Sequence, residues 1–431
     1  MSGTATVQPA GAAVWHRYSP ARRWGLLAIL FLVSLSNYVD RQVMSVLIEP
    51  IKAEFQASDT MMGLLSGFAF AACYAVLGIP VARLSDRGNR RIVITLSLAI
   101  WSMMSVACGF ARNFTMLALA RTGVGVGEAG AIPPAQSLIA DYFPPEQRTR
   151  ALGIFMASAT VGYLIAFMAG TQLAATYGWR MAFIALGLPG LLLAALAWLG
   201  LHEPRAGRSS ATAQAQHETF RQTLRALADK PSYVFINVSM ALYFLVAYGA
   251  ITWLPAYMGR VLRLELTEIG AAYGAVSALG ALVGTLGGGF VIDRLAKRNP
   301  RQLAQVPGLI LIASCPLYEL GLLTNTFGVF LAMVFIAGVG LSAAAPAMFS
   351  ALHLVCGSAR RAMAVAIAFF FANLLGLGFG PLITGALSDL FTAQFGPVGL
   401  RYALMAALAL LIPAGIALWL GGRTLEADRE A

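Results

Sequence analysis

The chain has 431 residues, of which 58% are hydrophobic and only 11% are charged. Soluble domains carry about 25% charged residues, so this composition excludes a water-soluble enzyme of this length. The formal net charge is +11, but the basic residues lie between long apolar runs. Basic residues between membrane spans are explained by the orientation of the protein in the membrane, so we expect no nucleic-acid partner. The composition therefore predicts a protein that crosses the lipid bilayer many times.

Apolar segments long enough to cross a membrane recur along the whole chain. A helix needs about 20 apolar residues to cross ~30 Å of hydrocarbon. No signal peptide is evident, because the first apolar run continues directly into a span. We expect an all-α membrane protein with twelve transmembrane helices in two pseudo-symmetric bundles, at roughly 24–47, 59–82, 91–111, 113–139, 149–174, 180–201, 232–257, 267–291, 303–323, 327–353, 361–387 and 399–421.

The longest segment between spans separates six predicted helices from six. We therefore divide the chain into a six-helix bundle over 1–201, a linker over 202–231 and a second six-helix bundle over 232–431. From about residue 217 to residue 229 the linker has apolar residues on one helical face. This pattern predicts an amphipathic helix lying on the inner membrane surface, and a solvated linker is the alternative.

Lysine and arginine are divided unequally between the two sides of the predicted bundle. With the N-terminus inside, 22 of them lie in cytoplasmic segments and six in outer segments. This division predicts a multi-pass protein with both termini in the cytoplasm. Arginine outnumbers lysine 27 to 3, which favours a GC-rich bacterial genome and hence the inner (plasma) membrane.

Four ionisable residues stand out at depth inside predicted spans: Asp40 and Arg41 in the first, Arg121 and Glu128 in the fourth. A charge at this depth costs about 2.5–3.5 kcal/mol on insertion scales, so such residues are functional candidates by default. Counting from the outer ends puts Asp40, Arg41 and Arg121 in one layer, ~13 Å deep, and Glu128 ~10 Å deeper.

Arginine binds phosphate or carboxylate bidentately, so we interpret Arg41 and Arg121 as a site for an anionic group. Asp40 and Glu128 are then proton-coupling candidates, with Asp40 able to pair with Arg121 and Glu128 competing for the same arginines. Protonation of Glu128 would release an arginine to hold the substrate. A permanently paired structural network without proton cycling is the alternative.

Polar and aromatic residues on other faces are further candidates for substrate contact. Asn37 lies three residues before Asp40 and shares its helical face. Tyr38, Tyr248 and Asn373 are candidates too, although ordinary packing or interface anchoring explains each of them equally well. The same holds for a wider group of aromatic residues: Tyr74, Tyr163, Tyr243, Trp253 and Tyr273.

No cofactor, metal or catalytic group is expected. The four cysteines form no CxxC pair and lie in or beside apolar runs, where they act as small core residues. The glycines at 123, 125 and 127 follow no strand, so they are not a dinucleotide loop, and close helix packing explains them. No P-loop lysine motif is present. We expect a protein that is not an enzyme.

An internal repeat carries a family resemblance. Ala82-Arg-Leu-Ser-Asp86-Arg87-Gly88-Asn-Arg90-Arg91 stands after the second span, and Gly289-Phe-Val-Ile-Asp293-Arg294-Leu-Ala-Lys297-Arg298 stands after the eighth. The first copy resembles the Gly-x-x-x-Asp-Arg-x-Gly-Arg-Arg loop of the major facilitator superfamily, with Ala82 and Asn89 where the family has glycine. The resemblance implies a cytoplasmic gate formed by Asp86, Arg87, Arg90, Asp293 and Arg294.

Four further blocks narrow the resemblance. They are Asn37-Tyr-Val-Asp40-Arg41, Ile48-Glu49-Pro50-Ile-Lys52, Arg121-Thr-Gly-Val-Gly125-Val-Gly127-Glu128-Ala-Gly130 and Asp141-Tyr-Phe-Pro-Pro-Glu146-Gln-Arg148. Together they resemble the Spinster group, whose animal members move lysophospholipids or sphingosine-1-phosphate. The resemblance implies a bacterial secondary transporter whose two halves rock around a central site.

We therefore expect a proton-coupled transporter for an amphiphilic anionic or zwitterionic lipid-like substrate, acting as a monomer in the lipid bilayer. Three alternatives stay open. An arginine pair also serves small organic anions such as sugar acids. A membrane-embedded lipid-modifying enzyme would need a His, Ser or metal constellation, which His353 alone does not supply. A receptor or sensor would bind a ligand without moving it.

Overall fold

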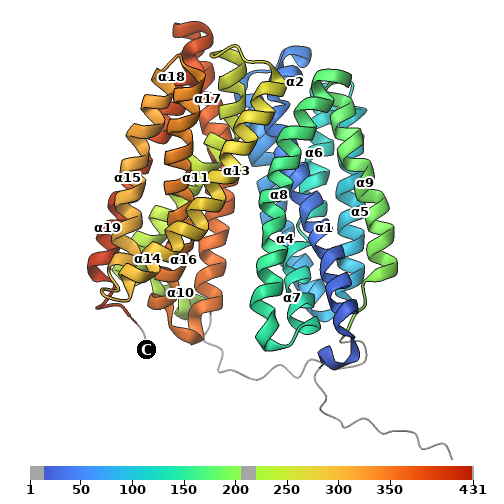
Figure 1. The fold of residues 1–431 in the computed structure, drawn as a ribbon, viewed down its shortest axis with the longest axis vertical. Helices are drawn as coiled ribbons and strands as arrows, with labels where there is room; N and C mark the ends of the chain where they lie inside the picture. The colour runs from blue at the N-terminus through green and yellow to red at the C-terminus, as the bar shows by residue number, and fades with distance from the viewer. Residues whose placement is uncertain (1–13, 205–219, 430–431) are drawn as a thin grey trace, which may run out of the picture.

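The computed structural model describes residues 14–204 and 220–429, and all regular structure in these residues is helical. The helices form two bundles that stand side by side (Figure 1). We call the end that holds α2 the outer end, and the end that holds α10 and the C-terminus the inner end. From the charge distribution the inner end is the one predicted to face the cytoplasm.

The N-terminal half begins with a short 3₁₀ turn and contains nine α-helices. Side chains of Ser19, Asn89 and Asn113 cap α1, α5 and α6 by accepting backbone N–H bonds, which explains where these helices start. The elements are η1 Val14–Arg17, α1 Pro20–Val46, α2 Ile48–Phe55, α3 Asp59–Gly63, η2 Leu64–Phe68, α4 Ala69–Arg87, α5 Arg90–Gly109, α6 Phe114–Glu128, α7 Ile132–Tyr142, α8 Pro145–Tyr177 and α9 Trp179–Gly200.

The C-terminal half begins with α10, which lies in the predicted linker. Its elements are α10 Phe220–Ala228, α11 Pro231–Arg260, α12 Leu266–Glu268, η3 Ile269–Tyr273, α13 Gly274–Val283, η4 Gly284–Gly288, α14 Gly289–Ala296, α15 Gln302–Leu323, α16 Phe327–Phe371, η5 Ala372–Phe379, α17 Gly380–Phe395, η6 Gly396–Val398, α18 Gly399–Leu408 and α19 Leu411–Thr424.

Each predicted span coincides with helix, although several spans are not single ideal helices. In the described part of the chain, nine helices are long and apolar enough to cross a membrane as continuous runs. The fourth predicted span is divided into α6 and α7. The tenth and eleventh run together through α16, which bends at Gly357, where φ is +63°. Glycine adopts this conformation without the steric penalty of a Cβ atom.

Four π-helical segments, η2, η3, η4 and η5, lie within spans that are predicted as ordinary helices. Such segments are rare and gather at functional sites because the extra residue per turn re-aims the backbone. Here η2 packs against η5, and η3 packs against α8 of the other half. Three of the four segments are therefore part of the surface where the two halves meet.

The two halves meet mainly through their outer and middle parts. α3 and η2 pack on α17, and α8 packs on α12, η3 and α13. The approach is close: a Cβ atom on Gly63 would lie 2.4 Å from the carbonyl oxygen of Pro381, and one on Gly67 would lie 2.8 Å from that of Gly378. Toward the inner end the ribbons of the halves diverge (Figure 1).

The short helix α10 lies within the segment predicted to be amphipathic, at the inner end of the C-terminal half. Thr223 and Leu227 are buried, while Arg221 and Arg225 are exposed. α10 packs against α11 and α16. Residues 217–219, the start of the predicted amphipathic helix, lie outside the described residues.

Candidate functional site

The four charges predicted inside the membrane come together in the N-terminal half. Nε of Arg41 lies 2.7 Å from Oε2 of Glu128, and Nη1 of Arg121 lies 3.6 Å from Oδ2 of Asp40. Asp40, Arg121 and Glu128 are at most 5% exposed. One buried and one partly buried guanidinium group thus face two buried carboxylates, and the formal charge of the cluster is zero.

Hydrogen bonding in this cluster is incomplete. Ser105 on α5 donates to Oδ1 of Asp40, and Arg121 also donates to the backbone oxygen of Asp40 over 3.4 Å. Oε1 of Glu128, Oδ2 of Asp40 and Nε of Arg121 have no hydrogen-bond partner within the described residues. A buried polar group without a partner is costly, so the cluster is suited to rearrangement rather than to stability alone.

Local structure explains why Glu128 stands where it does. It is the last residue of α6, where the helix dipole disfavours a negative charge, so the cation of Arg41 offsets an unfavourable position. Pro133 and Pro134 lie in the first turn of α7, where proline is tolerated because the backbone N–H that it lacks would have no partner within the helix. A Cβ atom on Gly127 would lie 2.6 Å from the backbone nitrogen of Trp101. Glycine there lets α6 lie directly against α5.

Two adjoining cavities lie beside the charge cluster. A small cleft of about 30 Å³ is lined by Arg41, Arg121 and Tyr248. A larger cavity of about 310 Å³ lies between the two halves, and Gln42 and Ile251 line both spaces. The walls of the larger cavity combine apolar side chains with hydroxyl groups, those of Tyr38, Tyr163, Tyr243, Tyr273, Ser277 and Tyr318.

The remaining predicted contact residues are distributed differently. Asn37 is buried inside the N-terminal half, with neither side-chain polar atom hydrogen-bonded, and it lines neither cavity. Asn373 donates to the backbone oxygen of Phe369 and also lines neither cavity. Trp253 is buried and donates to the backbone oxygen of Pro381. The side chain of Tyr74 lies outside the described residues.

The residues predicted as a cytoplasmic gate lie at the inner ends of both halves. The side chains of Asp86 and Arg87 are outside the described part of the structure. Asp293 and Arg294 line a pocket at the inner end of the C-terminal half. Arg90 is buried, and its Nη2 lies 2.5 Å from Oε1 of Glu203 and 2.7 Å from Oδ2 of Asp141. These contacts join Arg90 to α7 and to the start of the linker, and neither reaches the C-terminal half.

Replacing Arg90 by alanine is expected to lower stability without shifting the two halves relative to one another. The substitution leaves two carboxylates facing each other near the inner end, and removing one partner of a buried pair costs about 3–5 kcal/mol. Thermal unfolding in detergent should show a clearly lower melting temperature. Arg301→Ala is the matched control, because the Arg301–Glu426 pair is exposed and is expected to contribute at most about 1 kcal/mol. Equal melting temperatures for both variants would contradict this expectation.

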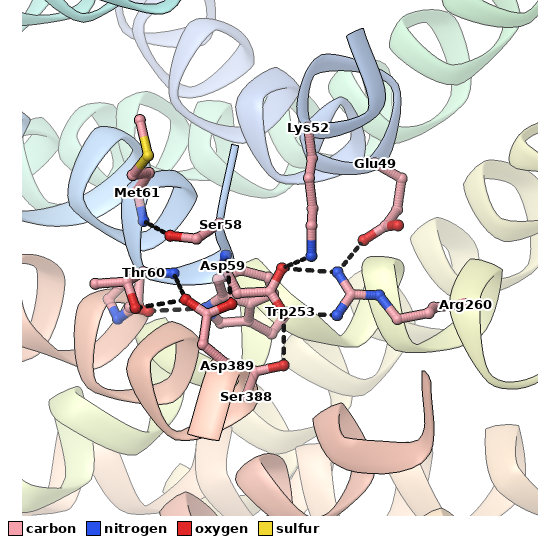
Figure 2. A network of polar contacts seen from close by, with 11 residues as sticks. Glu49, Lys52, Ser58, Asp59, Thr60, Met61, Trp253, Arg260, Ser388 and Asp389 are labelled. Carbon is pink, nitrogen blue, oxygen red and sulfur yellow. Dashed lines mark hydrogen bonds and ion pairs between the residues drawn. The ribbon is translucent and has the colours of Figure 1, made fainter. Parts of the chain in front are cut away.

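A second polar network joins the two halves at the outer end (Figure 2). Asp59 at the start of α3 is fully buried. Its carboxylate accepts from Lys52 over 2.5 Å, from Ser388 on α17 over 2.6 Å, and from both terminal nitrogens of Arg260 on α11 over 2.6 and 2.9 Å. Glu49 on α2 adds an ion pair to Arg260 at 2.6 Å.

Asp389 on α17 completes this outer network. Its carboxylate accepts from the backbone N–H groups of Asp59 and Thr60 over 2.8 and 2.7 Å, and from the hydroxyl of Thr60 over 2.6 Å. A residue of one half thus caps a helix of the other half, and an anion at a helix N-terminus is favoured by the helix dipole. The outer network consists of Glu49, Lys52, Asp59, Thr60, Arg260, Ser388 and Asp389.

Sequence reasoning placed Glu49 and Lys52 in a motif block, but it did not single out the rest of the outer network, Tyr318 or Gln42. Asp59 and Asp389 lie at span ends, where charged residues are ordinary. One signal was present: Ser58-Asp59 precedes an apolar run and predicts a helix start, and Ser58 caps α3. The second cap, Asp389, lies 330 residues from Asp59 and has no such signal. In the part of the chain that is described, no group of three or more His, Cys, Asp or Glu residues is arranged so that it could hold a metal ion.

Comparison with known proteins gives a consistent result. A model of the Major Facilitator Superfamily matches residues 30–321. An MFS-type efflux pump of Mycolicibacterium smegmatis is 33% identical, over 96% of this chain and 95% of that protein. A probable L-galactonate transporter of Escherichia coli is 29% identical, over 84% and 82%. Protein spinster homolog 1 of Homo sapiens is 29% identical, over 96% and 83%.

Solved structures extend this likeness to the fold. The crystal structure of a bacterial homologue of the human lysosomal transporter Spinster, in an inward-facing and unoccupied conformation, superimposes with a TM-score of 0.87. It is 31% identical in sequence, and the match covers 96% of this chain and 100% of that one.

Proposed function

Because the chain belongs to the major facilitator superfamily and shares its fold with a Spinster homologue, we propose that it is a proton-coupled secondary transporter of an amphiphilic anion or zwitterion. The substrate we propose is lipid-like, such as a lysophospholipid. We place the protein in the bacterial inner membrane with both termini in the cytoplasm, and we propose that it acts as a monomer because one chain supplies both halves of the site.

The observation that carries this proposal is the two-part site. The small cleft presents the guanidinium groups of Arg41 and Arg121, which suit a phosphate or carboxylate. The larger cavity next to it is lined by apolar side chains and tyrosine rings, which suit the acyl chain or another weakly polar part of a substrate. Gln42 and Ile251 border both spaces, so we propose one substrate molecule with its anionic head at the arginines and its apolar tail in the larger cavity.

Proton coupling is supported by the pairing of charges. While Glu128 is ionised, Arg41 has a buried counter-ion at 2.7 Å and has little to gain from a substrate anion. A proton on Glu128 removes that counter-ion, and the freed guanidinium can then bind the substrate head group. Departure of the substrate restores the pair once the proton leaves. Asp40 and Arg121 form a second carboxylate–arginine pair, one layer nearer the outer end than Glu128, and protonation of Asp40 would release Arg121 in the same way.

Alternating access needs one end of the site closed while the other is open. In this structure the outer network and the close packing of α3 on α17 hold the outer ends together, while the inner ends diverge (Figure 1). We therefore take the outer network as the contact that must break when the protein opens outward.

Flux measurements in proteoliposomes test this function. Labelled lysophospholipid and a labelled sugar acid are offered side by side, with and without an imposed pH gradient. We expect the lysophospholipid to move, and its accumulation to disappear when the gradient is collapsed. Empty liposomes and liposomes holding Arg121→Gln are the controls. Movement of neither compound above these controls would contradict the proposal.

A transporter of small organic anions is the second candidate. The likeness to a probable L-galactonate transporter supports it, and so does the cleft beside the arginines, which can hold a carboxylate without a tail. The two candidates give opposite results in the same assay. Movement of the sugar acid alone would retain the arginine site and overturn the lipid-like substrate.

A further inference from the structure

A basic pocket lies at the inner end of the C-terminal half, away from the central cavity. Its volume is about 490 Å³, and it is formed by α14, the segment after it, the start of α15, the inner part of α16 and the C-terminal tail. We call it the inner basic pocket, lined by Phe290, Asp293, Arg294, Ala296, Lys297, Pro300, Leu303, Leu354 and Arg429.

The charges of this pocket are unbalanced. Arg294, Lys297 and Arg429 bring three positive charges against the single carboxylate of Asp293, a net charge of +2. None of the three cations forms an ion pair or a side-chain hydrogen bond within residues 14–204 and 220–429. By contrast, Arg301 at the same end pairs with Glu426 at 2.7 Å. Among the described residues, the pocket therefore holds positive charge without an ion-pair partner.

The tail is anchored so that Arg429 belongs to the pocket. The residue before it, Asp428, accepts from the backbone N–H and the hydroxyl of Ser232 over 2.8 and 2.6 Å. This bond caps the first turn of α11. Lys230 also donates to the backbone oxygen of Asp428 over 3.3 Å. These contacts hold Arg429 beside α14.

Apolar surface is exposed next to the pocket. Phe290 on α14, which lines the pocket, is 68% exposed, and Leu286 on η4, about one turn before it, is 66% exposed. Leu286 precedes Lys297 by eleven residues, which is ~16 Å along a helix. That distance is close to half the thickness of the hydrocarbon core. A ligand with a charged head at Lys297 would therefore lay its tail along Phe290 and Leu286.

We propose that the inner basic pocket binds the phosphate head group of an anionic phospholipid from the inner leaflet. Basic pockets at the cytoplasmic ends of membrane helices suit such head groups, and each cation near the surface adds about 1 kcal/mol of attraction. The apolar surface below the pocket favours a lipid over free phosphate, which has no tail to bury. This site is separate from the central cavity and does not depend on the transported substrate.

Native mass spectrometry of the full-length protein tests the proposal. The protein is released from nanodiscs that hold equal amounts of phosphatidylglycerol and phosphatidylcholine, and the retained lipid is counted. We expect wild type to retain phosphatidylglycerol, and the double variant Lys297→Gln/Arg429→Gln to bind it at least about tenfold more weakly, a loss of about 1.4 kcal/mol. Arg301→Gln/Arg423→Gln removes the same charge at the same end and is expected to bind as wild type does.

Three results would overturn the proposal. The first is equal phosphatidylglycerol binding by both double variants. The second is an equal loss in Arg121→Gln, because the lipid would then occupy the central site. The third is full displacement of phosphatidylglycerol by millimolar inorganic phosphate, which would indicate a site for free anions. Since no transport is measured, failure of the proposed transport function would leave each of these results interpretable.

Discussion

Glu128→Gln is expected to reduce gradient-driven uptake by about 100-fold, a loss of about 2.7 kcal/mol. Glutamine has the shape of the protonated carboxyl group, and its side-chain oxygen can still accept from Nε of Arg41, which now lies 2.7 Å from Oε2. It cannot lose a proton, so Arg41 would never regain a charged partner. The cycle would stop at the step that resets the site after the substrate has left.

Substrate exchange distinguishes this effect from misfolding. Counterflow, in which labelled substrate exchanges for unlabelled substrate across the membrane, does not require Glu128 to release its proton. We expect counterflow by Glu128→Gln to stay within about threefold of wild type, a change of about 0.7 kcal/mol. Glu319→Gln is the matched control, since Glu319 on α15 contacts Cys315 and has no ion pair among the described residues. Full gradient-driven uptake by Glu128→Gln would exclude Glu128 from coupling.

Asp59→Asn is expected to shift the protein toward an outward-open state by about tenfold to 100-fold, or about 1.4–2.7 kcal/mol. Asparagine keeps the shape but removes the charge that holds Lys52 and Arg260 together. Breaking a buried pair costs about 3–5 kcal/mol. Part of that cost is recovered when the outer end opens and water reaches the two cations, so the closed state loses more than the open state.

Electron paramagnetic resonance distances between the halves measure this shift. Spin labels replace Tyr177 at the outer end of α8 and Phe395 at the outer end of α17, both of them exposed, after the four native cysteines have been replaced. We expect a second, longer distance to gain population in Asp59→Asn. Asp389→Asn should act in the same direction, because Asp389 caps α3 from the other half.

The control for this shift lies on the same outer surface. Glu54 pairs with Arg180 at 2.6 Å, and both belong to the N-terminal half. A hydrogen bond from Arg180 lowers the pKa of Glu54, so this carboxylate stays ionised at neutral pH. Glu54→Gln removes an ion pair without touching the C-terminal half, and we expect unchanged distances. Unchanged distances in Asp59→Asn as well would show that the outer network does not hold the halves closed.

Much of the architecture could be predicted from the sequence, because the bilayer selects spanning helices by the length and hydrophobicity of each segment alone. An apolar run of sufficient length becomes a span whatever its neighbours are, and the fold confirms an all-helical molecule of the major facilitator type. The cost of burying a charge likewise marks Asp40, Arg41, Arg121 and Glu128 as exceptional from their positions in apolar runs alone. The structure gathers these four side chains in one cluster.

The ion-pair partners of these charges could be predicted only in part. The sequence predicted that Asp40 can pair with Arg121, and the structure shows this pair. It left Glu128 with either arginine, and the rotation of α1 against α6 decides that Glu128 contacts Arg41. Asn37 shows the same limit. It shares a helical face with Asp40, yet the packing of α1 buries it away from both cavities.

The sequence by itself determined the spans, their predicted orientation and the unusual charges. Each of these depends on the free energy of transferring individual side chains from water to lipid. Only the tertiary structure decided the arginine that pairs with Glu128, the cavity between the halves and the outer network that joins Asp59 to Ser388, 329 residues away. Such contacts depend on how rigid helices pack side by side. The distances and angles between the helices are set by the packing of the whole bundle, so no single segment of the sequence predicts them.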